Sequence, residues 1–281
     1  MLLIDKDTDL YCSFAEKAGS KGSKFHNAGF QALGINAIYK SFSVENIQQA
    51  MFCMEFLNIK GAGITMPFKR EVLDYVHSVT QDAQVIGAAN TVVNEDGELV
   101  AYNTDWLAAK EFLQEHYSSS YELYVLGNGG YAAAVRYAAS HLGFKVRTIT
   151  RSNWNTIPNI NDSIVFNCTP VENIELGRDV GFVDCVATSH TGAYLAMLQA
   201  KHQFLLYTGQ HYPDIVQDTS QPIDEQTQTD CPEVVDEEQE NQSCPLNNES
   251  SNLSTRLGTW WRNLGFQKRD DKTCQSTRHT K

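Results

Sequence analysis

The chain has 281 residues, 42% of them hydrophobic, and a formal net charge of -12. This length favours two domains, since single domains usually hold roughly 100–200 residues. The acidic balance argues against nucleic acid as a partner, because binding to a phosphate backbone needs a basic face. A small molecule or a protein is favoured instead.

Seven cysteines are scattered along the chain in no zinc-binding spacing, which predicts reduced thiols and no metal site. The N-terminal apolar run is too short and too acidic for a signal peptide, and no run approaches the roughly 20 apolar residues of a spanning helix. We therefore expect a cytoplasmic protein with no membrane segment.

Helices and strands alternate in the first part of the predicted fold. Helical spacing of apolar residues marks residues 24–33 and 44–57, while residues 37–42 and 61–66 are typical of strands. This pattern indicates an α/β substrate domain.

The next part of the chain predicts a βαβ series. Strands are expected at residues 121–126, 145–150 and 163–167, and an Ala-rich helix at residues 132–142. Such a series implies a parallel sheet, so this part is predicted to be Rossmann-like.

The composition changes near residue 213. Residues 214–249 are rich in Asp, Glu and Gln and contain no Lys or Arg, so they cannot bury enough apolar area to offset the entropy of ordering them. We predict a disordered acidic tail over residues 214–281.

A glycine-rich turn follows the strand expected at residues 121–126 and reads Gly127-Asn-Gly129-Gly130-Tyr-Ala132. Gly127 permits a tight turn, Gly129 lets the backbone approach a pyrophosphate, and Ala132 lets a helix pack closely on the strand. This pattern predicts a dinucleotide site, and the alternative is an ordinary βα turn.

The next strand ends in Thr150-Arg151-Ser152, with no acidic residue for the ribose hydroxyls of NAD. A guanidinium and hydroxyls suit a 2′-phosphate, because Arg presents a planar fork of donors to phosphate oxygens. The predicted cofactor is therefore NADP. The alternative for Arg151 is a solvated surface cation.

Three segments place polar groups beside Gly and Pro, where a cleft can open. They read Gly61-Ala-Gly-Ile-Thr65-Met-Pro67-Phe-Lys69, Gly87-Ala-Ala-Asn90-Thr91-Val-Val and Tyr102-Asn103-Thr104-Asp105. These segments resemble the GxNVTxPxK, GAxNTV and GxNTD motifs of shikimate dehydrogenases, in the same order and at similar spacing. Four further stretches resemble motifs of that family: His26 to Tyr39, the turn at Gly127 with Thr150 to Ser152, Asn167 to Pro170, and Met197 to Ala200.

The resemblance covers nearly all of residues 10–210 and implies Lys69 and Asp105 as the catalytic pair. Oxidising a secondary alcohol needs a base near the hydroxyl while the hydride leaves for nicotinamide, and a lysine can serve. Without the resemblance, Lys69 would be assigned as a surface lysine and Asp105 as a helix N-cap. The resemblance further implies these ligand contacts: Ser13, Thr65, Asn90 and Gln199 for the substrate, and Gly127, Gly129, Gly130, Ala132, Thr150, Arg151, Ser152 and Thr169 for the cofactor.

The chain departs from the family at the substrate carboxylate. The family's Ser-x-Ser is represented either by Ser13-Phe14-Ala15 or by Ser20-Lys-Gly22, so one hydroxyl is absent. A lysine from the segment 17–24 is a candidate replacement, and Gly63 stands where the family has Asn. A missing charge-assisted bond is worth about 1.5–3 kcal/mol, enough to lower activity or change the substrate.

A larger departure follows Asp184, where the family continues with a tyrosine, a helix and a further strand. This chain has Ala187 at the tyrosine position and passes directly into the closing helix. We expect a shortened Rossmann sheet with an exposed edge.

The sequence therefore predicts an α/β protein with a substrate domain over residues 1–105, an NADP domain over residues 106–213 and the tail. The closing helix, at about residues 192–208, is expected to pack back on the first domain. The resemblance implies NADP-dependent interconversion of shikimate and 3-dehydroshikimate, or of a relative such as quinate. The expected ligand is a small hydroxy-carboxylate, and a homodimer is left open. The alternative is a catalytically impaired homologue that binds a nucleotide or a partner.

Overall fold

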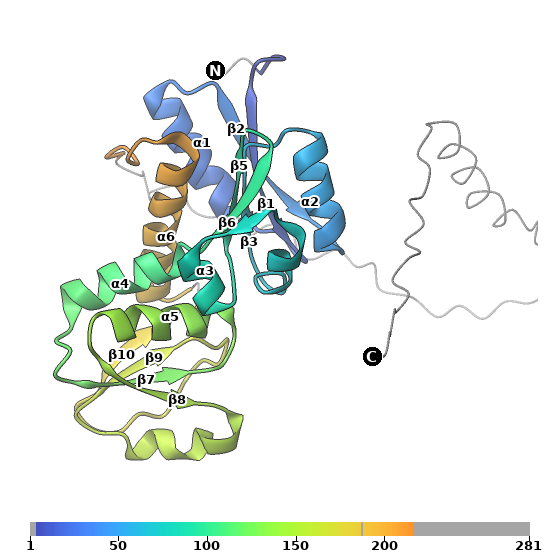
Figure 1. Ribbon diagram of the computed structural model, residues 1–281. Helices are drawn as coiled ribbons and strands as arrows, with labels where there is room; N and C mark the ends of the chain where they lie inside the picture. The colour runs from blue at the N-terminus through green and yellow to red at the C-terminus, as the bar shows by residue number, and fades with distance from the viewer. Residues whose placement is uncertain (1–3, 187, 216–281) are drawn as a thin grey trace, which may run out of the picture. The chain divides into compact units, whose positions relative to one another are not determined.

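The computed structural model describes residues 4–186 and 188–215, which belong to one compact unit of the chain. Two β-sheets organise this unit (Figure 1). Ala187, and the predicted tail beyond residue 215, lie outside the described residues. The predicted domain boundaries remain predictions.

The first sheet has six strands in the order β2-β1-β3-β5-β6-β4. Their bounds are β1 (Asp9–Ala15), β2 (Ala37–Ser43), β3 (Gly61–Ile64), β4 (Ser78–Val79), β5 (Thr91–Glu95) and β6 (Glu98–Tyr102). Strand β1 runs parallel to β2 and β3, whereas β5 runs antiparallel to β3 and β6. The chain segments that follow β1 and β3 therefore leave the sheet at the same edge.

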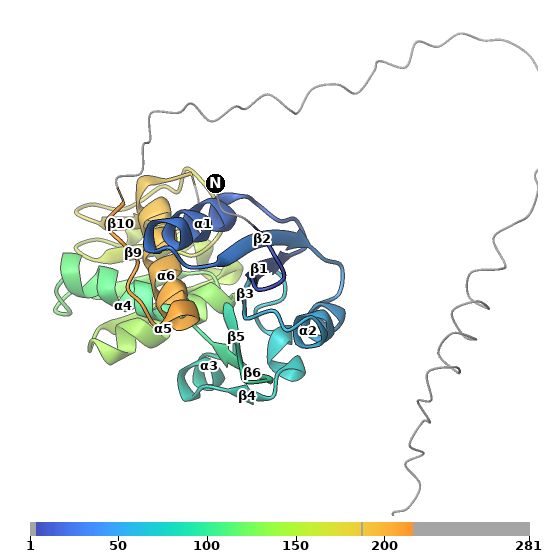
Figure 2. The same ribbon diagram turned by 90° about the horizontal axis from the view of Figure 1, so that it is seen from above.

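Helices cover both faces of this sheet. The helices α1 (Lys21–Leu33) and α6 (His190–Thr208) lie side by side on one face (Figure 2), where Phe30 and Phe204 are 5.4 Å apart between ring centroids. The helix α2 (Ile47–Phe56) covers the other face, with the 3-10 turn η1 (Glu71–Tyr75) beside it. Alternation along β1 explains the division, because Tyr11 packs in the cluster of α1 and α6 while Cys12 packs in the cluster of α2.

The second sheet is parallel throughout, with the order β10-β9-β7-β8. Its strands are β7 (Glu122–Leu126), β8 (Lys145–Ile149), β9 (Ile164–Asn167) and β10 (Gly181–Asp184). The other elements nearby are α3 (Gln81–Ile86), α4 (Asp105–His116), α5 (Gly130–His141) and the 3-10 segment η2 (Arg151–Asn159). The predicted Rossmann-like fold with a parallel sheet is confirmed.

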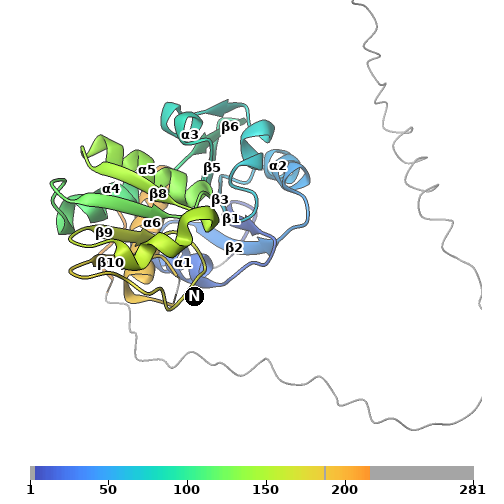
Figure 3. The same ribbon diagram turned by 90° about the horizontal axis from the view of Figure 1, so that it is seen from below.

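This second sheet is short, as the sequence predicts. The connection from β9 to β10, residues 168–180, contains no helix, and after Asp184 the chain turns within a few residues into α6. Within the part of the chain that the structure describes, no strand follows β10. In Figure 3, seen from below, β9 and β10 lie side by side, and β10 is the edge strand of the sheet.

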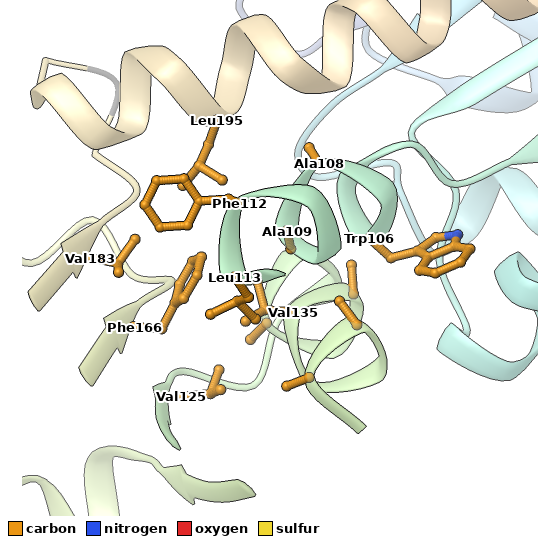
Figure 4. Close-up of a cluster of buried hydrophobic side chains, with 14 of the residues drawn as sticks. Trp106, Ala108, Ala109, Phe112, Leu113, Val125, Val135, Phe166, Val183 and Leu195 are labelled. Carbon is orange, nitrogen blue, oxygen red and sulfur yellow. The ribbon is translucent and has the colours of Figure 1, made fainter. Parts of the chain in front are cut away.

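The largest hydrophobic core lies between the second sheet and the helices α4, α5 and α6 (Figure 4). Phe112 of α4 meets Phe166 of β9 edge-on at 6.3 Å between ring centroids, and Leu195 of α6 belongs to the same cluster. Farther along α6, Phe204 and Tyr207 enter the core of the first sheet. One helix therefore packs into the cores of both sheets.

Candidate active site

Lys69 and Asp105 form an ion pair between the segment that follows β3 and the start of α4. Lys69 lies in the turn that follows β3, and its Nζ donates to Asp105 Oδ2 at 2.6 Å. Asp105 is the first residue of α4, with Thr104 as the N-cap, so its carboxylate sits at the positive end of the helix dipole. The side chains are 20% and 5% exposed, which leaves the lysine accessible and the carboxylate held inside.

Asn90 fixes the orientation of this carboxylate. Its Nδ2 donates to the second carboxylate oxygen, Asp105 Oδ1, at 3.0 Å, and lies 3.1 Å from Gln199 Oε1. Its Oδ1 accepts from Thr104 N at 2.6 Å. Both oxygens of Asp105 therefore have partners, and the predicted residues Lys69, Asp105, Asn90 and Gln199 form one continuous network.

Gln203 is a member of this network that the sequence interpretation missed. Its Nε2 donates to Asn90 O and to Thr91 Oγ1, both at 3.0 Å. Gln203 follows Gln199 by one helical turn, and residues at this spacing share a helix face. That spacing was the signal available in the sequence.

A cavity of about 630 Å³ opens beside the ion pair. Its walls include the predicted substrate residues Ser13, Thr65, Asn90 and Gln199, and also Ser20, Lys21 and Gln203. Both representatives of the family's Ser-x-Ser therefore reach the cavity, and among the lysines of the 17–24 segment Lys21 lines it.

Tyr39 occupies the space beside Gly63. A Cβ at Gly63 would lie 2.8 Å from Tyr39 Oη, so a side chain at this position would displace the hydroxyl. Burial raises the pKa of Tyr39 above its ordinary value, and its hydroxyl hydrogen-bonds Ser13. The tyrosine hydroxyl is therefore a neutral polar group in this wall of the cavity.

A second cavity, of about 660 Å³, lies beside the glycine-rich turn and is lined by Gly129, Gly130 and Thr169. Gly127 has a φ of 103°, and a Cβ there would be 3.0 Å from Thr169 Cγ2, so glycine is needed at this turn. A Cβ at Gly129 would meet nothing within 4 Å, which leaves the backbone open to a ligand.

The remaining predicted cofactor residues lie around this turn without lining the cavity. Ala132, in the first turn of α5, is fully buried, which fits the expected close packing of helix on strand. Thr150, Arg151 and Ser152 follow β8, the neighbour of β7, at the edge where Gly127 N donates to Ile149 O at 2.8 Å. Arg151 is exposed.

Four residues line both cavities: Thr65, Lys69, Tyr131 and Cys185. The Nζ of Lys69 lies 5.6 Å from the centroid of the Tyr131 ring, within the range of a cation–π contact. Burial, together with Cys185 and Cys168, raises the pKa of Tyr131 well above its ordinary value. Tyr131 fills a variable position of the glycine-rich motif, so no sequence signal indicated that it would line both cavities.

In the described ranges, no three His, Cys, Asp or Glu side chains gather as metal ligands would. No helix in residues 4–186 and 188–215 has both the length and the apolar character required to cross a membrane.

Comparisons with known proteins agree on one family. The shikimate dehydrogenase substrate binding domain family matches residues 17–92. A shikimate dehydrogenase-like protein of Haemophilus influenzae is 29% identical over 75% of this chain and 95% of its own length. The NADP(+) shikimate dehydrogenase of Alkaliphilus oremlandii is 34% identical over 61% of this chain, which spans 64% of that enzyme.

A solved structure of a shikimate 5-dehydrogenase-like protein superposes with a TM-score of 0.67 at 29% identity. The superposition covers 75% of this chain and 96% of that one. This chain therefore combines motifs that resemble those of shikimate dehydrogenases with the fold of a shikimate 5-dehydrogenase-like protein. The domain match, the relatives and the solved structure together support a shikimate dehydrogenase-like family member.

Proposed function

We propose that this chain is an NADP-dependent oxidoreductase that interconverts shikimate and 3-dehydroshikimate, or a close hydroxy-carboxylate relative such as quinate. The observation that carries the proposal is the Lys69–Asp105 pair, which lies in a cavity that shares Lys69 with the cavity at the glycine-rich turn. Lys69 thus lines both a cavity that would hold a small substrate and a cavity that would hold a dinucleotide.

Lys69 would take the proton of the substrate hydroxyl, and Asp105 would hold the lysine in position. The pairing of Asp105 Oδ1 with Asn90 keeps the carboxylate from rotating, so its contact with Lys69 is preserved. Gln199 and Ser13, which both line the cavity, would hydrogen-bond the polar groups of the substrate. This arrangement orients a hydroxyl toward the lysine, which is the requirement for general base catalysis.

The residues at the glycine-rich turn fit a dinucleotide. The open backbone at Gly129, the glycine-dependent turn at Gly127 and the start of α5 at Gly130 are the features that accept a pyrophosphate. Arg151, with Thr150 and Ser152, would hold the 2′-phosphate that distinguishes NADP from NAD. When bound, the nicotinamide supplies the hydride acceptor or donor of the reaction.

The test is NADPH formation with purified protein, NADP and either shikimate or quinate, with NAD in parallel. Lys69→Ala should abolish turnover and leave NADP affinity nearly unchanged, because Lys69 acts on the substrate. Lys201→Ala, which changes an exposed lysine of α6, is the matched control and should keep wild-type turnover. A fully active Lys69→Ala protein would exclude the proposed proton route.

A catalytically impaired, nucleotide-binding homologue is the second candidate. Gly63 removes a polar side chain from the substrate cavity, and the second sheet ends at β10 beside the cofactor cavity. NADP binding without turnover of either substrate would favour this candidate.

We further propose a cytoplasmic protein without a nucleic-acid partner. A homodimer is one arrangement to test, and light scattering of the purified chain would measure its mass in solution.

A further inference from the structure

Two arginines converge on the glycine-rich turn from different parts of the fold. Arg70 directly follows Lys69, and its Nη2 donates to Asn128 O at 3.0 Å. Arg136 lies on α5, where its Nη1 donates to Gly127 O at 3.3 Å and its Nη2 to Asn128 Oδ1 at 3.2 Å. The two guanidinium groups therefore hold consecutive residues of one turn.

Within residues 4–186 and 188–215, their positive charges have no carboxylate partner. Among the described residues, neither Arg70 nor Arg136 forms an ion pair. Burial lowers the pKa of Arg136, and the nearby charge of Arg70 lowers it further. Glu172 lines the adjacent cavity, yet it pairs with neither arginine. Two unneutralised like charges create a local positive potential that a bound anion would offset.

The position of this charge matches the cofactor cavity. Arg70 lines that cavity together with Gly129 and Gly130. Arg70 thus lies next to open backbone, where a ligand can approach closely, and Arg136 binds the same turn through Gly127 O and Asn128 Oδ1.

We propose that Arg70 and Arg136 form a cationic clamp for the diphosphate of a dinucleotide at the glycine-rich turn. The clamp rests on the proposed cofactor site and adds two residues to it. Its role differs from that of Arg151, which follows β8 and is assigned to the 2′-phosphate. Because Arg70 is adjacent to Lys69 in the chain, a diphosphate held by the clamp also restrains the backbone that carries the lysine.

Calorimetric titration with ligands that differ in their phosphates tests the clamp. The ligands are NADP, NAD, ADP-ribose, inorganic pyrophosphate and adenosine 2′-monophosphate. Arg70→Gln and Arg136→Gln should each weaken every diphosphate-containing ligand by about tenfold or more, because each removes a charge-assisted bond. Affinity for adenosine 2′-monophosphate, which has no diphosphate, should stay unchanged.

Two control variants separate the contributions. Arg178→Gln changes an exposed arginine near the start of β10, at the opposite edge of the sheet, and should bind every ligand as the wild type does. Arg151→Gln should weaken NADP and adenosine 2′-monophosphate but leave NAD unchanged. Circular dichroism of each variant checks that it has folded.

The clamp is wrong if both glutamine variants bind pyrophosphate and ADP-ribose like the wild type, or if they weaken NADP and not NAD. It is also wrong if the wild type binds neither pyrophosphate nor ADP-ribose. A wild type that binds both of these ligands, with weaker binding in the two variants, supports the clamp even where no alcohol is oxidised. The absence of alcohol oxidation would then count against the proposed enzymatic activity and not against the clamp.

Discussion

The stability of this protein should fall as the pH drops below about 6.5, because of one buried histidine. His26 of α1 is 1% exposed and stacks on Tyr39 at 4.5 Å between ring centroids. Burial lowers its pKa from 6.5 to about 3, although a hydrogen bond with Gln203 acts in the opposite direction. The folded protein therefore keeps the ring neutral at a pH where the unfolded chain would protonate it.

The sign and size of the effect follow from proton linkage. Between the unfolded pKa of 6.5 and the folded pKa of about 3, the unfolded state binds one proton more than the folded state. The free energy of unfolding then falls by about 1.4 kcal/mol for each pH unit, so about 2 kcal/mol is lost at roughly pH 5. The contribution is fully present above pH 6.5.

Urea unfolding across this pH range measures the slope. His26→Phe keeps a ring in the cluster but removes the titrating group, so its stability should depend less steeply on pH by about 1.4 kcal/mol per unit. His211→Asn, at an exposed position, should keep the wild-type slope. Equal slopes in the wild type and His26→Phe would refute the assignment, whatever the absolute stability of the variant.

Three further changes test the packing and the site. Phe166→Ala should cost about 3–5 kcal/mol in urea unfolding, because it opens a cavity in the core of the second sheet, whereas a loss below about 1 kcal/mol would contradict that core. Asn46→Ala should cost about 1 kcal/mol by the same assay, since Asn46 Oδ1 caps α2 by accepting from Gln49 N at 3.0 Å, and Asn46→Ser should restore most of it. Tyr131→Ala should lower kcat/KM roughly fivefold, because it removes the cation–π contact with Lys69. Tyr131→Phe keeps the ring, so its kcat/KM should stay near the wild-type value. Equal losses in both variants would indicate that the hydroxyl is responsible instead.

The predicted helices and strands were found close to their expected positions wherever periodicity or turn residues marked them. The helix expected at residues 44–57 begins at Ile47, because Asn46 provides the cap that periodicity alone does not locate. Strand β1 was not assigned from the sequence. It is flanked by strands and packed on both faces, so its residues lack the apolar–polar alternation that indicates a half-buried strand.

Sequence motifs identified only part of the candidate site. Motifs identified four candidate functional residues, and the fold brings them together: Lys69, Asp105, Asn90 and Gln199. Arg70 and Arg136 belong to no motif, and their meeting at Asn128 depends on how the two sheets pack. Sequence patterns record local spacing, so contacts of this kind become visible only in the structure.

The closing helix explains how the site persists beside a shortened sheet. The start of α6 is fixed by Ser189, whose Oγ accepts from Gly192 N at 2.9 Å and donates to Asp184 O at 2.7 Å. A Cβ at Gly192 would lie 2.1 Å from Val186 O, so the helix rests directly on the chain that leaves β10. Because Leu195 packs in the second core and Gln199 reaches Asn90, this anchor sets the position of the site's amides. The network around Lys69 and Asp105 therefore keeps its support beside the short second sheet.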